Sequence, residues 1–334
     1  MLVARAPGKL VALGEYAVLD GAPAVVLALD RYAEATIDSS PDELCRLTTR
    51  SAELVERRFA PGESSGAALV DLVTAAAPHL KWTATIDSQA FYSAGAKLGL
   101  GSSAAVLTAW AGAYAAFARG QGASVAEPRV EALIELHRQF QGGKGSGLDV
   151  AASYTGGVIT FSLARPGLPQ IGSVRLPNSV GFAGIFTGRS ASTPELVSRY
   201  RAWRRERTKE AAELLCRLTA QAEAGCAALT GDDAAGWLEA FEAYGLILQE
   251  LGVSIGADIV TAEHREIGAE ARRHGVAYKV SGAGGGDLGL ACAADAEALR
   301  AFSQSVGDRG FRVIKVSLAD HGLQVAQRGA GWQR

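Results

Sequence analysis

Two short glycine-rich segments carry hydroxyl and carboxyl groups in positions suited to phosphate chemistry. The first stands directly before an alanine-rich, uncharged stretch and reads Gly99, Leu100, Gly101, Ser102, Ser103, Ala104. A glycine turn at a helix start leaves backbone N–H groups unpaired at the positive end of the helix dipole, which favours bound phosphate. The two serines add hydroxyls that can cap the helix, contact phosphate oxygens or ligate Mg²⁺. An ordinary serine cap after a tight turn explains the segment equally well.

The second segment runs from Gly142 to Asp149 and includes Ser146 and Gly147. Its closely spaced glycines are expected to hold Asp149 on a shaped loop, where a carboxylate can orient an acceptor group, take its proton or sit near a metal. The alternative is that Asp149 only caps the segment that follows. The order of residues is not that of the P-loop of nucleotide triphosphatases, because Lys144 is followed by Gly145.

Two more clusters have less specific patterns. Residues 281–289 contain five glycines in nine positions between two predicted strands, which favours close approach of the backbone to a ligand over a plain hairpin. Near the start, Lys9 ends an Ala-Pro-Gly-Lys segment and is followed by Glu15 and Tyr16. Lys9 alone indicates little, because most lysines are simply solvated.

Two basic segments have simple explanations beside a functional one. Residues 188–193, with Arg189 and several hydroxyls, can bind an anionic group or can form a routine helix start before Pro194. The run from Arg199 to Arg207 is interpreted as a solvated helix face.

Hydrophobic periodicity predicts an antiparallel opening sheet followed by mixed helices and strands. The Asp20-Gly21 pair predicts a hairpin within that opening sheet. Predicted helices cover 67–77, 97–118 (after a turn), 127–141, 194–229 (one or two), 232–251 and 255–274. Predicted strands cover 83–86, 158–161, 180–187, 277–280, 288–292 and 313–316. The Pro- and Gly-dotted stretch 165–177 predicts a linker, and hence domains at 1–176 and 177–334.

Composition excludes several classes of protein. The 334 residues are 48% apolar and 20% charged, which is globular and not disordered. A net charge of -2 leaves no global basic excess for nucleic acid. The four cysteines lack zinc or C-x-x-C spacing and are expected to be buried thiols of a reducing compartment. No signal peptide is seen, and the uncharged stretch 98–118 favours a buried helix over a membrane span. We expect a cytoplasmic protein with neither a membrane nor a nucleic-acid partner.

In combination, the four clusters resemble the GHMP superfamily of small-molecule kinases, which includes galactokinase, homoserine kinase, mevalonate kinase and phosphomevalonate kinase. The matching segments run from Ala6 to Gly289. Within the superfamily the chain is most similar to the phosphomevalonate kinases, through segments 6–19, 97–105, 137–152 and 281–287. Asp287 after the glycines differs from mevalonate kinases. Arg138 stands where mevalonate kinases carry a Glu that binds magnesium.

The resemblance implies an α+β GHMP kinase fold, with an N-terminal domain like domain 2 of ribosomal protein S5 and a ferredoxin-like C-terminal domain. It implies that ATP and the acceptor meet between the two domains, with Mg²⁺ as cofactor. The implied reaction transfers the ATP γ-phosphoryl group to 5-phosphomevalonate, giving 5-diphosphomevalonate and ADP in the mevalonate pathway of isoprenoid biosynthesis. Mevalonate kinase or another GHMP alcohol kinase is the alternative, and the chain is expected to be a monomer or homodimer.

The same resemblance assigns roles to the residues already named. Lys9, Lys97 and Asp149 are the expected catalytic residues, residues 99–104 the expected ATP site, and Ser103 the expected metal ligand. The expected substrate-binding residues are Tyr16, Ser146, Gly147, Ser281, Gly282, Ala283 and Gly284. An acceptor phosphate with a second pKa near ~6 is mostly dianionic at neutral pH, so Asp149 is expected to act through geometry more than through proton removal.

Overall fold

The chain forms two compact units that interleave along the sequence. The computed structural model describes residues 1–93, 95–143, 145–165, 168–189 and 193–329. The first unit comprises Met1–Lys9, Ala28–Gly157 and Leu318–Arg334, and the second comprises Leu10–Leu27 and Val158–Ser317. Strands β1 (Leu2–Leu13) and β2 (Ala24–Ser39) therefore contribute residues to both units. The predicted sequential division near residue 176 stays a prediction.

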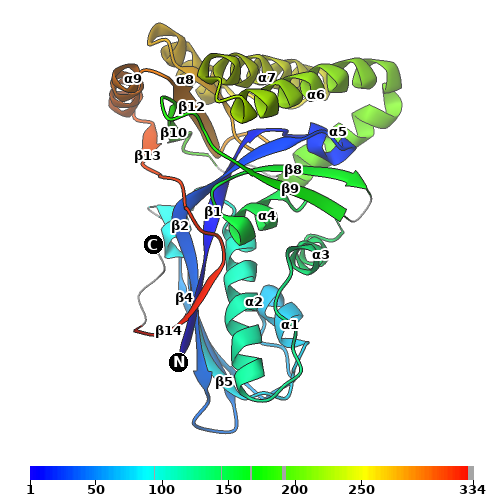
Figure 1. The fold of residues 1–334 in the computed structure, drawn as a ribbon, viewed down its shortest axis with the longest axis vertical. Helices are drawn as coiled ribbons and strands as arrows, with labels where there is room; N and C mark the ends of the chain where they lie inside the picture. Colours follow the sequence, from blue (N-terminus) through cyan, green and yellow to red (C-terminus); the bar gives the residue numbers. More distant parts are fainter. Residues whose placement is uncertain (94, 144, 166–167, 190–192, 330–334) are drawn as a thin grey trace. The chain divides into compact units, whose positions relative to one another are not determined.

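The described part of the first unit is built from a mixed sheet and helices (Figure 1). Strand β5 (Trp82–Asp87) lies between β2, to which it is antiparallel, and β3 (Cys45–Arg50), to which it is parallel. Strand β4 (Leu54–Phe59) pairs with β3, and β14 (Gln324–Gln327) pairs with β1. The remaining elements are η2 (Gln89–Phe91), β6 (Tyr92–Ser93), β7 (Ala96–Lys97), α1 (Ala68–Thr74), α2 (Ser102–Gly120), α3 (Val130–Phe140) and α4 (Leu148–Thr155).

Helix α2 contains most of the uncharged stretch 98–118, and it is buried on most of its surface. Trp110 packs against Trp82 of the sheet with ring centroids 5.2 Å apart, and the Tyr114 hydroxyl donates to the carbonyl of Ala77 at 2.7 Å. Its many alanines let it pack closely against neighbouring elements. None of the described helices combines the length and apolar character needed to cross a bilayer.

The second unit contains a four-stranded antiparallel sheet in the order β11-β12-β10-β13. Taken along the chain this order is the βαββαβ arrangement of a ferredoxin-like fold, with α8 before the second strand and α9 before the fourth. The core beneath the two helices includes Ile185, Ile267 and Phe302. The strands are β10 (Gly181–Phe186), β11 (Ala277–Val280), β12 (Leu288–Ala293) and β13 (Arg312–Ile314). The helices are α5 (Thr193–Glu206), α6 (Thr208–Thr230), α7 (Ala234–Ser254), α8 (Ala262–Arg273) and α9 (Ala296–Asp308).

The predicted linker was wrong, because β9 (Leu168–Val174) occupies most of it and pairs with β8 (Val158–Arg165). Within the described sheet β9 pairs with β8 alone, and an edge strand of this kind tolerates proline and glycine. The predicted hairpin at Asp20-Gly21 was also wrong. This pair instead ends the 3₁₀ helix η1 (Ala17–Asp20), with Gly21 in the left-handed conformation.

Two smaller expectations also need correction. Helix α8 begins at Ala262 rather than near residue 255, because the Thr261 side chain caps it by accepting from the N–H of His264. Cys45 and Cys292 are buried as expected, but Cys216 is exposed and Cys226 is half-buried. Both of these lie on α6, which buries only part of its surface.

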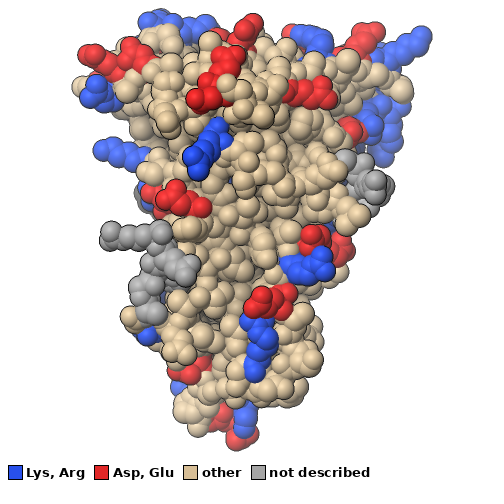
Figure 2. Space-filling model, in the orientation of Figure 1, with Lys and Arg blue, Asp and Glu red and all other residues tan. Residues whose placement is uncertain are grey.

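Charged side chains of both signs are interspersed on the face shown in Figure 2, with broad uncharged areas between them. This pattern agrees with the balance of 33 basic and 35 acidic residues.

Candidate active site

Strand β1 holds the glycine turn that precedes α2. The N–H of Lys9 donates to the carbonyl of Leu100 at 2.8 Å. Gly8 makes this approach feasible, since a Cβ there would lie 2.7 Å from the same carbonyl oxygen. Gly101 is the N-cap residue of α2, has a φ of 78° and offers no side-chain cap. The first N–H groups of α2 are therefore uncapped by their N-cap residue, as an anion site requires.

Lys9 and Lys97, the two lysines predicted to be catalytic, both belong to the first unit. The Lys9 side chain crosses Gly101 so closely that a Cβ at Gly101 would lie 3.0 Å from the Lys9 Cγ. Lys97 is exposed on β7, just before the turn. Among the residues that the structure describes, neither ammonium group has an ion-pair partner. Both charges are thus available to an anionic ligand.

The loop before α4 is fastened to α3. Arg138 donates to the carbonyl of Ser146 at 3.0 Å, and a Cβ at Gly147 would lie 2.5 Å from Ile134 Cγ2. Gly147 has a φ of 90° and is the N-cap residue of α4. Asp149 follows in the first turn, with 21% of its side chain exposed. Its carboxylate is therefore presented from a buttressed turn.

His137 links two of the predicted site residues, and the sequence analysis assigned it no role. It lies on α3 and is 1% exposed. Its Nε2 is 3.1 Å from Ser103 Oγ, and its Nδ1 is 3.7 Å from Asp149 Oδ2. The signal was its position on the buried face of a predicted helix with Leu133 and Ile134, where a polar residue needs partners.

The glycine-rich cluster of residues 281–289 belongs to the second unit, and its loop joins β11 to β12. The Tyr16 hydroxyl donates to the carbonyl of Ala283 at 2.6 Å. Ser281 Oγ donates to the carbonyl of Val11 at 2.9 Å and accepts from the N–H of Val11 at 3.0 Å. The hydroxyls of Tyr16 and Ser281 therefore hold the loop in place.

Two further side chains fix this loop from beneath. Glu15 accepts from the N–H of Gly282 at 3.3 Å, and His264 Nε2 lies 3.0 Å from the carbonyl of Gly286. That carbonyl can only accept, so Nε2 carries the proton and Nδ1 accepts from the Tyr278 hydroxyl at 2.7 Å. Burial lowers the pKa of His264 to about 4, so the ring is neutral at physiological pH.

Glu15 is itself one half of a buried ion pair. Lys279 Nζ lies 2.5 Å from Glu15 Oε1, and the two side chains are 0% and 1% exposed. Burial raises the pKa of Glu15 and lowers the pKa of Lys279, and the attraction between the two groups opposes both shifts.

These contacts leave donors of the loop uncommitted. Within the described part of the chain, the N–H groups of Ala283, Gly284 and Gly286 have no backbone or side-chain acceptor. The carbonyls of Ala283 and Gly286 are taken up by Tyr16 and His264. Unpaired N–H groups in a loop with left-handed glycines are suited to binding an anion.

Comparison with known proteins agrees with this geometry. Residues 71–157 match the family GHMP kinases N terminal domain. The chain is 30% identical to the phosphomevalonate kinase of Streptomyces sp. (strain CL190), with 90% of this chain and 91% of that protein covered. The chain belongs to the phosphomevalonate kinase family of the GHMP kinases. The predicted family and the predicted α+β GHMP kinase fold are confirmed.

Solved structures of the same fold extend over the whole of this kinase. The Lin0012 protein from Listeria innocua has a TM-score of 0.84 at 24% identity, covering 98% of this chain and 99% of that one. Streptococcus pneumoniae phosphomevalonate kinase, in complex with phosphomevalonate and AMPPNP, has a TM-score of 0.78 at 20% identity, covering 95% and 100%. The GHMP kinase fold therefore extends over nearly the full length of this kinase, as it does in these two proteins.

Oxygen groups of the type that Mg²⁺ prefers lie near the glycine turn before α2 of the kinase. Ser103 Oγ and the Asp149 carboxylate are oxygen groups that both lie close to the His137 ring. Mg²⁺ is usually held by one or two protein oxygens together with substrate phosphates, so a larger protein cage is not required. Among the described residues no group of three or more His, Cys, Asp or Glu side chains forms a metal cluster.

Two sequence features of the kinase receive a structural explanation. Arg138, at the position of the magnesium-binding Glu of mevalonate kinases, anchors the 145–146 backbone instead. Arg189 pairs with Glu263 at 3.3 Å, and α5 begins at Thr193, as the helix-start interpretation predicts. Ser190 and Ser192, two of the hydroxyl-bearing residues of the alternative anion site, lie outside the described residues.

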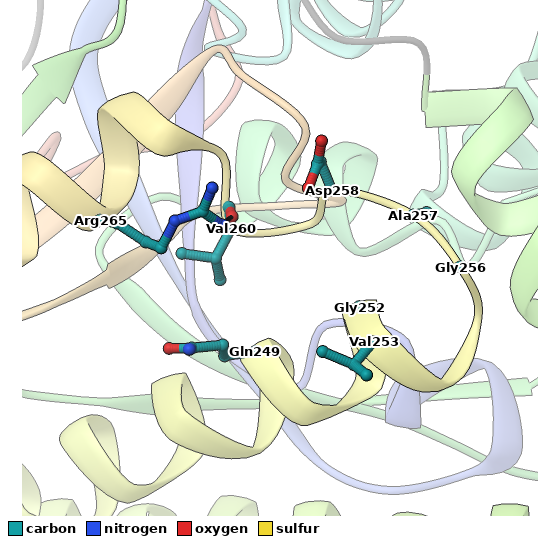
Figure 3. Close-up of a pocket in the computed structure, with 8 residues that line it drawn as sticks. All are labelled: Gln249, Gly252, Val253, Gly256, Ala257, Asp258, Val260 and Arg265. Carbon is teal, nitrogen blue, oxygen red and sulfur yellow. Dashed lines mark hydrogen bonds between the residues drawn. The ribbon is translucent and has the colours of Figure 1, made fainter.

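A pocket of about 330 Å³ opens in the second unit of the kinase, between the end of α7 and the start of α8 (Figure 3). Arg265 on its wall donates to the carbonyl of Val260 at 2.6 Å. The neighbouring residue Ile259 accepts from the N–H of Gly285, so this wall also supports the glycine loop. The pocket is lined by Gln249, Gly252, Val253, Gly256, Ala257, Asp258, Val260 and Arg265.

Proposed function

We propose that this enzyme transfers the γ-phosphoryl group of ATP to the phosphate of 5-phosphomevalonate, giving 5-diphosphomevalonate and ADP. The observation that carries the proposal is two separate sets of backbone N–H groups without a capping or accepting partner in the described chain, one in each unit, in a chain of the phosphomevalonate kinase family. A kinase whose acceptor is an alcohol needs only one strong phosphate cradle. A kinase whose acceptor is itself a phosphate benefits from a second.

The first unit supplies the nucleotide site. The N–H groups at the start of α2 donate hydrogen bonds to the ATP phosphates, and Lys9 and Lys97 neutralise their charge. Ser103 and Asp149 would be the residues that hold Mg²⁺, which would supply positive charge to offset that of the phosphates. Phosphoryl transfer asks the protein mainly for positioning and charge stabilisation, and these are the contributions of this site.

The second unit supplies the acceptor site. The N–H groups of Ala283, Gly284 and Gly286 are available to donate to an anionic group. The hydrogen bonds to the carbonyls of Ala283 and Gly286 hold the loop in its conformation. The substrate phosphate is the group of 5-phosphomevalonate that fits these donors. The predicted substrate roles of Tyr16 and Ser281 then lie in shaping the loop, because their hydroxyls are engaged.

In this reaction Asp149 acts by orienting the acceptor and not by removing a proton from it. The acceptor phosphate is mostly dianionic at neutral pH and brings its own nucleophilic oxygen. We therefore expect Asp149→Asn to lower the single-turnover rate by less than about tenfold, whereas removal of a general base lowers rates by about 10²–10⁴. A loss in the latter range would refute the orienting role.

The deciding experiment compares ADP release from Mg-ATP with 5-phosphomevalonate and with mevalonate at equal concentrations. We expect turnover with 5-phosphomevalonate alone. Lys97→Ala should then raise the KM for ATP, while Lys81→Ala, which removes an exposed lysine paired with Glu43, should leave it unchanged. Turnover with mevalonate alone would overturn the acceptor assignment and retain the ATP site.

A further inference from the structure

A histidine lies between the two oxygen ligands of the phosphate site. His137 comes from α3, Ser103 from the first turn of α2 and Asp149 from the first turn of α4. The imidazole is 3.1 Å from the serine oxygen on one side and 3.7 Å from the carboxylate on the other. Three helices thus meet through one side chain within the first unit.

The ring has little freedom to leave this position. It is 1% exposed and stacks on Phe140, with ring centroids 6.1 Å apart and planes 24° apart. The same helix is fastened to the loop before Asp149 by Arg138 and by the contact of Ile134 with Gly147. His137 therefore lies on a rigid support relative to both of its partners.

The chemistry of the partners selects one tautomer. The Asp149 carboxylate lies 3.7 Å from Nδ1, too far for a hydrogen bond, and its negative charge favours the tautomer whose proton is on Nδ1. Nε2 is then an acceptor, and the Ser103 hydroxyl must donate to it. With its proton directed at the ring, the serine oxygen presents its lone pairs elsewhere, where a cation can use them.

We propose that His137 is a positioning residue of the phosphoryl-transfer site, which holds the Ser103 oxygen as a metal ligand and keeps the Asp149 carboxylate aligned with it. The inference rests on the proposed function, in which these two residues hold Mg²⁺. Without the imidazole the hydroxyl rotates freely and its proton competes with the cation for the same oxygen. Groups that orient metal ligands in this way typically change metal affinity or activity by 10–100-fold when they are removed.

The first test measures metal binding without catalysis. Mn²⁺ is titrated into the enzyme–ADP complex and followed by electron paramagnetic resonance. His137→Gln places an amide oxygen near the position of Nε2 and retains an acceptor for Ser103, whereas His137→Leu has a similar volume and no acceptor. We expect Mn²⁺ affinity within threefold of wild type for the Gln variant and at least tenfold weaker for the Leu variant. Equal affinities in the two variants would overturn the proposal.

The second test observes the ring directly. In ¹⁵N-histidine-labelled enzyme at pH 8, the resonances lost in His137→Gln identify His137 among the five histidines. We expect a protonated Nδ1 and an unprotonated Nε2, and the opposite tautomer would refute the argument. His79→Ala, at an exposed histidine, is the control and should change neither the metal affinity nor the His137 resonances.

Activity separates this inference from the proposed function. If wild type turns over 5-phosphomevalonate, His137→Leu should need at least tenfold more Mg²⁺ for half-maximal rate, and an unchanged Mg²⁺ requirement would overturn the role of His137. If wild type turns over no candidate acceptor, the proposed function fails. The Mn²⁺ affinities and the tautomer still decide the position of the serine oxygen in that case.

Discussion

Replacing Lys279 by methionine is expected to lower the free energy of unfolding by about 3–5 kcal/mol. The Lys279 ammonium is 0% exposed and contacts Glu15 Oε1 at 2.5 Å and the carbonyl of Val280 at 2.8 Å. It also lies 5.3 Å from the ring of Phe241 and 5.8 Å from that of Tyr244. Methionine fills much of the same space and removes the charge.

The magnitude follows from what the substitution leaves behind. The Glu15 carboxylate is 1% exposed, and its Oε2 has no hydrogen-bond partner among the described residues. Without Lys279 its main remaining contact is the N–H of Gly282 at 3.3 Å. An uncompensated buried charge of this kind accounts for the 3–5 kcal/mol, whereas replacement of both partners by neutral groups is often tolerated.

The sign of the pH dependence is a further part of this prediction. Burial already raises the pKa of Glu15, and removal of Lys279 removes the group that opposes this shift. In Lys279→Met the folded protein therefore binds a proton that the unfolded chain releases above its own lower pKa. The variant should be less destabilised near pH 5 than near pH 8.

Urea unfolding at pH 5 and pH 8 checks these expectations on wild type, Glu15→Gln, Lys279→Met and the double variant. Domains of 150–250 residues shift by about 2–4 °C per kcal/mol, so a thermal scan at pH 8 should show a Tm lowered by roughly 6–20 °C for Lys279→Met. The double variant should be more stable than Lys279→Met. A destabilisation below 1 kcal/mol, or strictly additive effects of the two substitutions, would refute the buried-pair argument.

Three further predictions concern the loops and the lysines. The folded pKa of His264, about 4, lies below the unfolded value near ~6.5, so the neutral ring should contribute about 3 kcal/mol of stability that is present above pH 6.5 and lost as the pH falls to 4. His264→Gln should flatten that part of the curve of unfolding free energy against pH. An unchanged slope would contradict the prediction. Gly101→Ala should raise the KM for ATP at least tenfold in steady-state assays, because φ is 78° and the new Cβ would press on Lys9; an unaltered KM would show that the turn is not the nucleotide site. Lys97→Ala should leave the Tm within about 1 °C of wild type, because the side chain is exposed and unpaired within the described chain. Isothermal titration calorimetry should show weaker ATP binding by this variant. A large loss of stability would point to a structural role instead.

Local signals predicted most of the elements. The strand at 277–280 has the predicted bounds, the strand at 83–86 is one residue longer at each end, and the strand at 288–292 is one residue longer at its end. The stretch at 165–177 was misassigned because proline and glycine are common both in linkers and in edge strands. Whether such a segment pairs depends on a neighbour, here β8, and not on its own composition.

The candidate site divides in the same way. Lys9, Gly101, Ser103 and Asp149 were identified because glycine turns and polar residues at helix starts have a local pattern. The roles of Glu15, His137 and Lys279 were not, because each depends on a partner far away in the sequence. Glu15 and Lys279 are 264 residues apart, and Ser103 and His137 are 34 apart.

The sequence by itself determined the family, the reaction class and the glycine turns proposed to bind anions, because these depend on short segments whose backbone conformation and chemistry are set locally. Tertiary structure alone decided which buried groups support those turns. A buried carboxylate, ammonium or imidazole is stable only beside its partner, and the partner is chosen by the packing of whole helices and strands. The partners of Glu15, His137 and Lys279 are therefore known only from the tertiary structure.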